Sequence, residues 1–523
     1  MDARVVDRKA GKTAWAILAA MGVASFGAAL LFSTAIGPAL PAIKTDLNLS
    51  LAEQTWTITA YTLAFGVALV AGGRMGDVIG EAKIIVTGFI VFGAGLVLSA
   101  VAISGLVIIS GRAIQGVGVG ICAPATLSIV VNTFPIARRG FAIGVWGFAH
   151  GLGTFAGPLF TAWMMRIASW RAVFWAALLL AALVIVITML ATRGYKSVPA
   201  QGKYDWAGLL IGGTGITLIT YVLQNSSGNL TAATLGALLA AGVVLLCVFT
   251  YAEKRTASPL VDFSLWRERL FLVGCVGNAA VGFIYIPFLT FVGSLLFIDV
   301  LGYSPTRAGW VIVMTTGVCM LCQPPAGRWV DKVGPGLPIT AALALQALAL
   351  AWIGASFGPV TTVAHMAAPL TLMGIGVGIA LPACNTAAMS AVDTKRAGMG
   401  SGVMQMAFSI AASLGMALVT SVAGVSGGAK SAARPGQHTE FHELADRYAN
   451  AVQHGKFAQA NDILATLPSD SADAIKRAAA ATLSSVITMS MLVLAPLALA
   501  AALFTWVIVG RRRVPDCTEL TEP

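Results

Sequence analysis

Long apolar runs alternate with short polar or glycine-rich stretches along almost the whole chain. A helix needs roughly 20 apolar residues to cross the hydrocarbon core of a membrane. By this measure the sequence predicts fourteen membrane-spanning helices, and therefore an all-α polytopic membrane protein. The predicted ranges are 14–43, 55–73, 83–104, 105–131, 140–165, 170–192, 206–225, 231–252, 270–298, 305–327, 337–356, 361–390, 398–424 and 482–510.

Two patterns occur twice at a nearly constant offset. The pattern G-R-x-x-D-x-x-G stands at 73–80 and again 254 positions later at 327–334. The run G-V-G-V-G-I-C-A-P at 116–124 returns as G-I-G-V-G-I-A-L-P at 374–382, 258 positions later. The offsets predict two six-helix halves with a helical hairpin inserted between them. Such internal repeats are typical of transporters, whose site lies between the repeats.

The repeats divide the chain into five predicted parts. These are a cytoplasmic N-terminus 1–13, a first six-helix bundle 14–192, a linker 193–269 with the inserted hairpin 206–225 and 231–252, a second bundle 270–510 that includes an outer loop 425–481, and a cytoplasmic tail 511–523. Within that loop, helical spacing predicts one or two short amphipathic helices, and a loop without a role is the alternative. The apolar positions concerned are Phe441, Leu444, Tyr448, Val452, Ile463 and Leu467.

Composition and charge agree with a membrane protein. Of the 523 residues 57% are apolar and 11% are charged, whereas a soluble domain carries roughly 25% charged residues. The formal net charge is +11, and 22 of the 33 Lys and Arg residues fall on the side that holds both termini. This bias predicts cytoplasmic termini in an inner membrane, with the excess charge against anionic lipids, and it argues against a nucleic-acid partner.

The sequence predicts no enzyme, metal site or cofactor. The seven cysteines fall in apolar segments and in the tail, where packing is their expected role, and Cys319-x-x-Cys322 has no second pair or nearby histidine. Gly11-Lys12-Thr13 resembles the end of a phosphate-binding loop, but Val6 replaces its first glycine. The energy for transport is therefore expected from ion gradients.

Arg112 and His150 are the ionisable side chains predicted to lie well inside the apolar segments. A charge in hydrocarbon costs roughly 3 kcal/mol or more, so both need a reason. Arg112 is predicted to face the central cavity, with snorkelling to the outer surface as the alternative. His150 can titrate near neutral pH, with a packed neutral histidine as the alternative. With Glu53 at an outer segment end, they are the proton-coupling candidates.

The duplicated carboxylates are predicted to close the cytoplasmic mouth. Asp77 can accept hydrogen bonds from the N-terminal amides of a neighbouring helix, or pair with Arg138 or Arg139. Small residues permit tight turns and close helix packing, and a proline bends a helix. The residues predicted to form this latch and to permit rocking are Gly73, Asp77, Gly80, Gly327, Asp331, Gly334, Gly151, Gly157 and Pro158.

A site for an amphipathic ligand combines an apolar body with a few polar groups. Polar and aromatic side chains inside the segments are therefore candidates to line it, although helix packing is the alternative role for each. The candidates are Tyr61, Gln115, Trp146, Asn278, Tyr285, Phe288, Asn385 and Gln405.

Several of these motifs resemble the fourteen-span drug–proton antiporter branch of the major facilitator superfamily. Residues 73–80 resemble its loop between spans two and three, 111–116 its span-four motif with Arg112, and 147–158 its span-five antiporter motif. The resemblance implies the two-bundle fold and export of hydrophobic or amphipathic compounds by proton antiport. It also ties Arg112 to proton handling.

The chain departs from this branch at two places. Phe32 stands where the branch commonly carries a span-one aspartate, and Glu81-Ala82 replaces usually basic residues. Since the segments lack carboxylates in their interiors, neutral or anionic amphiphiles fit Arg112 better than cations. Two alternatives stay open: a lipid or metabolite exporter or uncoupled facilitator of the same fold, and a membrane scaffold whose loop 425–481 binds a partner. We expect a monomer whose partners are a small amphipathic substrate, protons and the bilayer.

Overall fold

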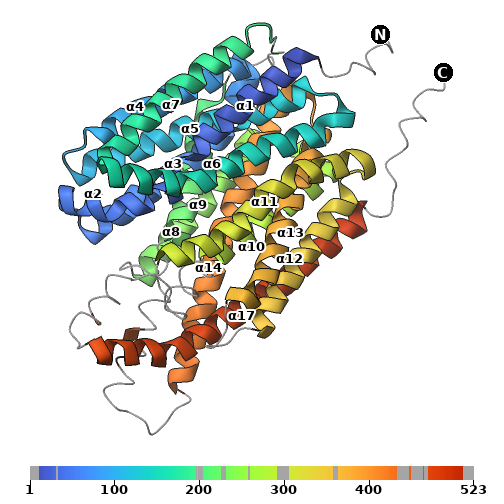
Figure 1. The fold of residues 1–523 in the computed structure, drawn as a ribbon. Helices are drawn as coiled ribbons and strands as arrows, with labels where there is room; N and C mark the ends of the chain where they lie inside the picture. Colours follow the sequence, from blue (N-terminus) through green and yellow to red (C-terminus); the bar gives the residue numbers. More distant parts are fainter. Residues whose placement is uncertain are drawn as a thin grey trace.

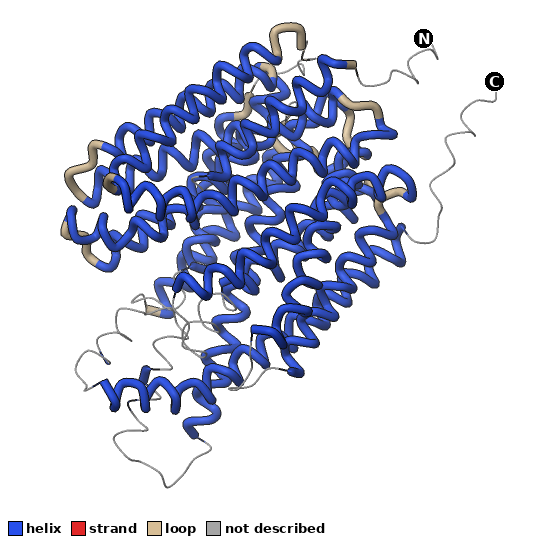
Figure 2. Tube along the Cα trace, in the orientation of Figure 1, coloured by secondary structure: helices blue, strands red, loops and turns tan. Residues whose placement is uncertain are grey.

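The computed structural model describes residues 11–30, 33–195, 197, 204–224, 231–256, 259–290, 305–356, 363–432, 444, 447, 448, 463 and 469–509, and among them the regular structure is helical throughout (Figures 1 and 2). Each of the fourteen predicted segments overlaps one long helix of the described residues. The elements are α1 Lys12–Leu30, η2 Ser33–Ala39, α2 Leu40–Leu47, α3 Leu51–Ile79, α4 Glu81–Ala100, α5 Gly105–Thr133, η3 Ile136–Arg138, α6 Arg139–Ile167, α7 Trp170–Ala191, α8 Trp206–Gln224, α9 Ala232–Glu253, η4 Phe263–Arg267, α10 Arg269–Thr290, α11 Pro305–Val333, α12 Gly336–Ser356, α13 Val363–Ser390, η6 Thr394–Arg396, α14 Ala397–Ala432 and α17 Ser469–Val509.

Eleven of the described helices are long and apolar enough to cross a membrane. The three long helices outside this group are α6, α8 and α11. Helix α8 contains a shorter apolar stretch, Trp206–Val222. Helix α6 contains six glycines and His150, and α11 contains Gln323, two internal prolines and a charged C-terminal end, all of which lower the mean hydropathy. The chain is thus a multi-pass helical membrane protein.

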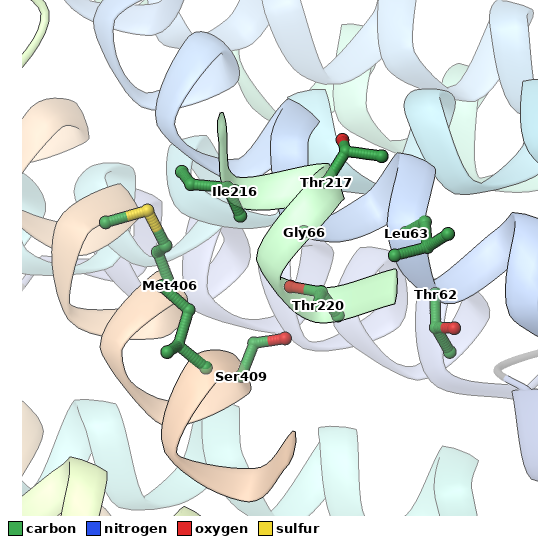
Figure 3. A pocket seen from close by; sticks show the side chains of 9 residues that line it. Thr62, Leu63, Gly66, Ile216, Thr217, Thr220, Met406 and Ser409 are labelled. Carbon is green, nitrogen blue, oxygen red and sulfur yellow. The ribbon is translucent and has the colours of Figure 1, made fainter. Parts of the chain in front are cut away.

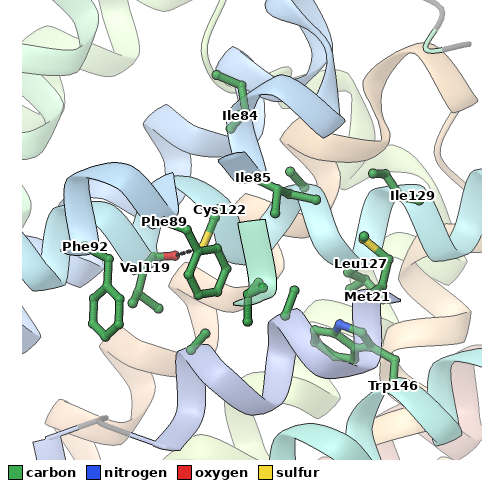
Figure 4. Close-up of a cluster of buried hydrophobic side chains, with 14 of the residues drawn as sticks. Met21, Ile84, Ile85, Phe89, Phe92, Val119, Cys122, Leu127, Ile129 and Trp146 are labelled. Atoms are coloured by element: carbon green, nitrogen blue, oxygen red, sulfur yellow. Dashed lines mark hydrogen bonds between the residues drawn. The ribbon is translucent and has the colours of Figure 1, made fainter. Parts of the chain in front are cut away.

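Two hydrophobic clusters hold the helices together. The first is built mainly from α1 and α3 to α7, and its large side chains include Phe89, Phe92 and Trp146 (Figure 4). The second is built mainly from α10 to α14 and α17. The first cluster also includes Met389, Val392 and residues of early α14, so the two groups of helices share apolar contacts at one end.

The two groups meet through crossed helix pairs. Helix α3 packs on α14, and α11 packs on α6. The G-R-x-x-D-x-x-G repeats lie at the ends of α3 and α11. The two contacts are therefore equivalent under the repeat, as expected for halves related by a pseudo-twofold axis. Helices α8 and α9 pack on each other, and α8 also contacts α3 and α14.

Both described ends of the chain lie on one side of the bundle, which we call the termini side (Figure 1). Trp15, in the first turn of α1, packs edge-on against Phe134 and Phe141, with ring centroids 5.4 and 6.1 Å apart. A Cβ on Gly336 would lie 2.5 Å from Val509, the last residue of α17. Both copies of the repeated motif end on this side.

The stretch from α9 to α10 is seated on the termini side. Leu260, Val261 and Leu265 are buried in the first cluster. Asp262 caps η4 through the Ser264 amide and forms an ion pair with Arg396, in the turn before α14. The hydrogen bond from Ser264 and the charge of Arg396 outweigh the effect of burial, so the pKa of Asp262 is lowered. This connection therefore contacts both halves.

One predicted boundary was wrong. The segment 14–43 is not a single helix: the described part of α1 ends at Leu30, and the 3-10 helix η2 and the short helix α2 occupy 33–47. Pro38 lies within η2 and Pro41 in the first turn of α2, and a proline lacks the amide donor that continues an α-helix. Within the predicted loop 425–481, α14 continues to Ala432 and α17 begins at Ser469.

Only part of the predicted amphipathic region of that loop is described. Leu444, Tyr448 and Ile463 contact the second cluster, and Tyr448 is buried. Phe441, Val452 and Leu467 lie outside the described residues.

Candidate functional site

The two repeated aspartates bind the starts of helices in the opposite half. The amides of Gly398 and Met399, in the first turn of α14, donate to Asp77 at 2.7 and 2.8 Å. The amides of Gly140 and Phe141, in the first turn of α6, donate to Asp331 at 2.7 and 2.9 Å. A helix N-terminus carries unsatisfied amides and partial positive charge, so a carboxylate is well suited to it. The halves are thereby tied twice on the termini side.

Glycines allow the helices to approach closely enough for these contacts. A Cβ on Gly73 would overlap the carbonyl oxygen of Gly398, and a Cβ on Gly327 would overlap that of Gly140. The last glycine of each motif ends its helix in a conformation that other residues rarely adopt, with φ of 108° at Gly80 and 80° at Gly334. Each motif thus has a first glycine that allows the close approach, an aspartate that binds the facing helix, and a last glycine that ends the helix.

The environments of the two aspartates differ. Asp77 is 3% exposed, whereas Asp331 is half-buried. Burial raises the pKa of Asp331, while the amides of Phe141 and Gly140 and the charge of Arg138 act in the opposite direction. Arg138 and Arg139 were predicted as alternative partners of Asp77; Arg138 acts on Asp331 instead, and Arg139 donates from Nε to the Phe134 carbonyl at 3.2 Å. Asp77 therefore makes the more desolvated of the two contacts.

A third polar link lies beside Asp77, and it was not foreseen from the sequence. Glu81 is 4% exposed and accepts hydrogen bonds from Ser128 at 3.2 Å and Asn132 at 3.0 Å, both on α5. Asn132 also donates to the carbonyl of Thr394, in the turn before α14, at 3.3 Å. The acidic residue that departs from the family pattern thus belongs to a chain of hydrogen bonds that reaches the other half.

Arg112 is fully buried among α3, α4 and α5. Its Nε donates to the Thr57 carbonyl at 3.2 Å and its Nη1 to Gln115 Oε1 at 2.7 Å. The guanidinium carbon lies 4.3 Å from the centroid of the Tyr61 ring, within the range of a cation–π contact. Gln115 in turn donates to Ser99 at 2.8 Å. The Arg112 guanidinium is therefore held inside the first half and does not extend to the outer surface, which was the alternative prediction.

His150 lies in the middle of α6 and its side chain is exposed. Its Nδ1 is hydrogen-bonded to Ser25 Oγ on α1 at 3.3 Å. Its ring is stacked with Trp146, whose Nε1 donates to Thr126 on α5 at 3.1 Å. The imidazole therefore contacts α1, and through Trp146 it is linked to α5 of the same half.

The face of α6 next to His150 meets the second half. A Cβ on Gly151 would lie 2.9 Å from Met320 Cβ on α11. Gly157 is buried further along α6, and Pro158 lies within the helix without ending it. His150 is therefore close to the α6–α11 contact, but it is outside the apolar core.

Glu53 has a structural partner of its own. Glu53 and Ser50 form a capping box at the start of α3, in which the Ser50 amide donates to Glu53 Oε2 at 2.9 Å and the Glu53 amide donates to Ser50 Oγ at 3.3 Å. The carboxylate also lies against Gly105, at the start of α5. The candidates Arg112, His150 and Glu53 thus occupy three separate environments.

Most of the predicted cavity residues lie in helix contacts. Tyr61, Gln115, Trp146, Asn278, Tyr285, Phe288 and Asn385 are each less than 10% exposed, and Gln405 is half-buried. Asn278, for example, donates to the Met404 carbonyl on α14 at 3.1 Å. A role in lining a substrate cavity therefore stays a prediction.

A small pocket lies elsewhere, between α3, α8 and α14 (Figure 3). Its volume is about 10 Å³, which is room for roughly one water molecule. Sequence reasoning did not select these residues, although threonines three positions apart on α8 were a signal. They are Thr62, Leu63, Gly66, Ile216, Thr217, Thr220, Met406, Ser409 and Ile410.

The comparison with protein families gives one match. The model described as Major Facilitator Superfamily matches residues 21–416. This range contains α3 to α13 and most of the helix contacts described above.

Related proteins include drug and antibiotic exporters. The "Tetracenomycin C resistance and export protein" of Streptomyces glaucescens is 29% identical over 421 residues, covering 77% of this chain and 75% of that protein. The "Puromycin resistance protein pur8" of Streptomyces alboniger is 30% identical over 403 residues, covering 75% and 78%. The "Multidrug efflux pump LfrA" of Mycolicibacterium smegmatis is 26% identical over 420 residues, covering 78% and 81%.

Solved structures agree in fold. The human organic anion transporter MFSD10 (TETRAN) matches with a TM-score of 0.56 and 15% identity, over 93% of this chain and 100% of that chain. The proton:xylose symporter XylE matches with a TM-score of 0.59 and 14% identity, over 96% and 97%. At this level of identity the likeness concerns the fold alone.

Proposed function

The chain belongs to the Major Facilitator Superfamily, and on this premise we propose that it exports hydrophobic or amphipathic compounds in exchange for protons. The relatives that are named as exporters or resistance proteins support the direction and the class of substrate. We place it in the fourteen-span drug–proton antiporter branch, because each of the fourteen predicted segments has its own long helix.

The crossed aspartate contacts are the observation that carries this proposal. Asp77 and Asp331 each close the termini side by holding a helix of the other half. Transport by alternating access requires that such contacts break when that side opens. Four hydrogen bonds related by the repeat form a suitable element, because they are made in one state and lost in the other.

Proton coupling is assigned to His150, with Arg112 in support. An unperturbed imidazole titrates near pH ~6.5, and His150 is exposed beside the α6–α11 contact. The buried charge of Arg112 on α5 sets the electrostatic potential of the first half. Each proton that moves through 100 mV supplies roughly 2.3 kcal/mol, so a proton gradient can drive export. Glu53, at the start of α3, is the outer contributor.

The proposal also covers the orientation of the protein in the membrane, its two halves and the substrate path. The side with both termini is cytoplasmic, because 22 of the 33 basic residues fall there. The halves are 14–192 and 270–510, and the protein acts as a monomer. The residues Tyr61, Gln115, Trp146, Asn278, Tyr285, Phe288, Asn385 and Gln405 line the substrate path when the termini side opens.

Efflux from membrane vesicles tests the proposal. Wild-type vesicles should move an amphipathic dye against its gradient, and an uncoupler should abolish this movement. His150→Ala should retain downhill movement but lose the response to the proton gradient. His365→Ala is a matched control, since it removes an exposed histidine at the start of α13. Undiminished gradient-driven efflux by the His150 variant would contradict the coupling assignment.

An uncoupled facilitator or lipid exporter of the same fold is the second candidate. Phe32 favours it, because the branch commonly carries an acid at that position. Movement of the dye that is unaffected by the uncoupler in the wild type would select this candidate. The scaffold alternative predicts instead that deleting the loop 425–481 abolishes function, whereas His150→Ala does not.

A further inference from the structure

Helix α8 of the inserted hairpin follows α3 along most of its length. The hydroxyl of Tyr204, just before α8, is hydrogen-bonded to the Ala71 carbonyl at 3.3 Å. Further along, a Cβ on Gly213 would lie 2.7 Å from Val67. Near the opposite side of the bundle, Tyr221 stacks on Trp56 with ring centroids 5.7 Å apart. Since α8 also contacts α14, it covers the seam where α3 and α14 meet.

This seam widens away from the termini side. Next to the Asp77 contact the backbones touch, and a Cβ on Gly402 would lie 2.7 Å from the Leu69 carbonyl oxygen. One turn further, a Cβ on Gly66 would lie 3.9 Å from Ser409 Oγ. The pocket lies at this widening, and α8 forms its third wall (Figure 3).

Hydroxyl groups give the pocket its polarity. Thr62 donates its proton to the Thr59 carbonyl at 3.0 Å, and Thr217 donates to the Gly213 carbonyl at 2.8 Å. Because both protons are used within their own helices, both oxygens keep lone pairs that can accept a hydrogen bond. Ser409 from α14 and Thr220 from α8 add two further hydroxyls. The lining contains no charged side chain among its described residues.

We propose that this pocket is a second binding site, at the α3–α8–α14 seam, for a neutral amphiphile that carries a hydrogen-bond donor. The donor, such as a hydroxyl group, binds the threonine oxygens, and the apolar body lies along Ile216, Met406 and Ile410. The inference rests on the proposed export function and names its substrate class. A charged group would be disfavoured there, because the lining offers no counter-ion and desolvation is costly.

The pocket is large enough for the donor group of such a compound but not for its apolar body. Its present volume of about 10 Å³ corresponds to one water. The apolar body therefore requires that α8 moves away from the seam. The α8 segment meets α3 through the hydrogen bond of Tyr204, the close approach at Gly213 and one aromatic stack, which is a smaller contact than the packing within either half.

Two fluorescent probes that differ by a single donor test this site. One is a neutral BODIPY dye with an eight-carbon alcohol and a diazirine, and the other is its methyl ether. Binding is measured on the purified full-length protein by fluorescence anisotropy, and the diazirine product is mapped by mass spectrometry. The alcohol should label residues 216–220 and 406–410 and should bind more tightly than the ether.

The variant Thr217→Val with Ser409→Ala removes two hydroxyls at nearly constant volume. It should weaken binding of the alcohol by roughly five- to tenfold and change that of the ether less than twofold. Thr250→Val is the matched control, because Thr250 donates to its own helix in the same way, to the Leu246 carbonyl at 2.8 Å, on the other helix of the hairpin.

Equal binding of alcohol and ether, labelling confined to other segments, or absence of labelling would each overturn the inference. Binding in detergent needs no proton gradient. A failed uncoupler experiment would therefore reject the proposed coupled export without affecting this result, and the reverse also holds.

Discussion

Replacing Asp77 by Asn tests whether the crossed contacts hold the termini side closed. The substitution removes the negative charge and leaves an amide of almost the same size. One oxygen remains as acceptor, so the two amides of Gly398 and Met399, now at 2.7 and 2.8 Å, cannot both be satisfied as before. We expect the conformational equilibrium to shift toward a state that is open on this side.

The size of the shift follows from the bonds that are changed. A hydrogen bond to a charged group is worth about 1.5–3 kcal/mol, and a neutral one about 0.5–1.5 kcal/mol. Two weakened bonds cost about 2 kcal/mol in the closed state, and the lost interaction with the helix N-terminus adds about 0.3–1 kcal/mol. A change of about 2–3 kcal/mol alters the ratio of closed to open protein by roughly 30- to 150-fold. The low exposure of Asp77, 3%, favours the upper part of this range.

Spin labels at Lys83 and Lys332 provide the assay, because both side chains are exposed and they lie next to the two motif copies in opposite halves. The distance distribution from pulsed electron resonance should gain a longer component in Asp77→Asn. Asp46→Asn is the matched control, since the same charge is removed from a carboxylate that pairs with Arg171 inside one half. An unchanged distribution in Asp77→Asn, or the same change in the control, would refute the reasoning.

Three further predictions concern packing, buried charge and pH. Gly327→Ala should open the termini side and lower transport, because its Cβ would overlap the facing helix, whereas Gly317→Ala on the same helix meets nothing within 4 Å and should leave dye efflux unchanged. Arg112→Met should abolish transport and lower the apparent unfolding temperature by a few degrees, because each buried acceptor left without a donor costs about 1–3 kcal/mol; an unchanged melting curve would contradict this. The hydrogen bond from Arg171 lowers the pKa of Asp46 from its ordinary 3.8, so the stability that it adds is present above that pH and is lost as the pH falls below it. Thermal unfolding below pH 3.8 should therefore depend less on pH in Asp46→Asn than in the wild type, and parallel curves would contradict this.

The course of the helices could be predicted from the sequence because apolar length is a local property. Each predicted segment has its helix, and the superfamily that the motifs indicated is confirmed by the family match. Hydropathy alone did not predict that η2 and α2 replace a continuous helix over 33–47. The run 14–43 is mostly apolar, and Pro38 and Pro41 each remove a backbone donor from it.

Contacts between distant segments could be predicted only in part. The motif indicated that Asp77 meets a helix start, but not that this helix is α14, 321 positions away. The hydrogen bonds of Glu81 and the pocket at Ser409 depend on how α5, α8 and α14 are placed in space. A one-dimensional pattern shows which face of a helix is apolar, but it does not identify the neighbour of that face.

The connection between α9 and α10 limits how far the two halves can separate on the termini side. If fully extended, residues 254–268 could span at most roughly 50 Å, and this length alone would not restrict the separation of the halves. Leu260 and Val261 are buried, however, and Asp262 is bound to Arg396, so this length is not available at rest. Wide separation of the halves on the termini side must first pull two aliphatic side chains into water, at about 1.5–3 kcal/mol each. The buried linker thus opposes wide opening of the termini side.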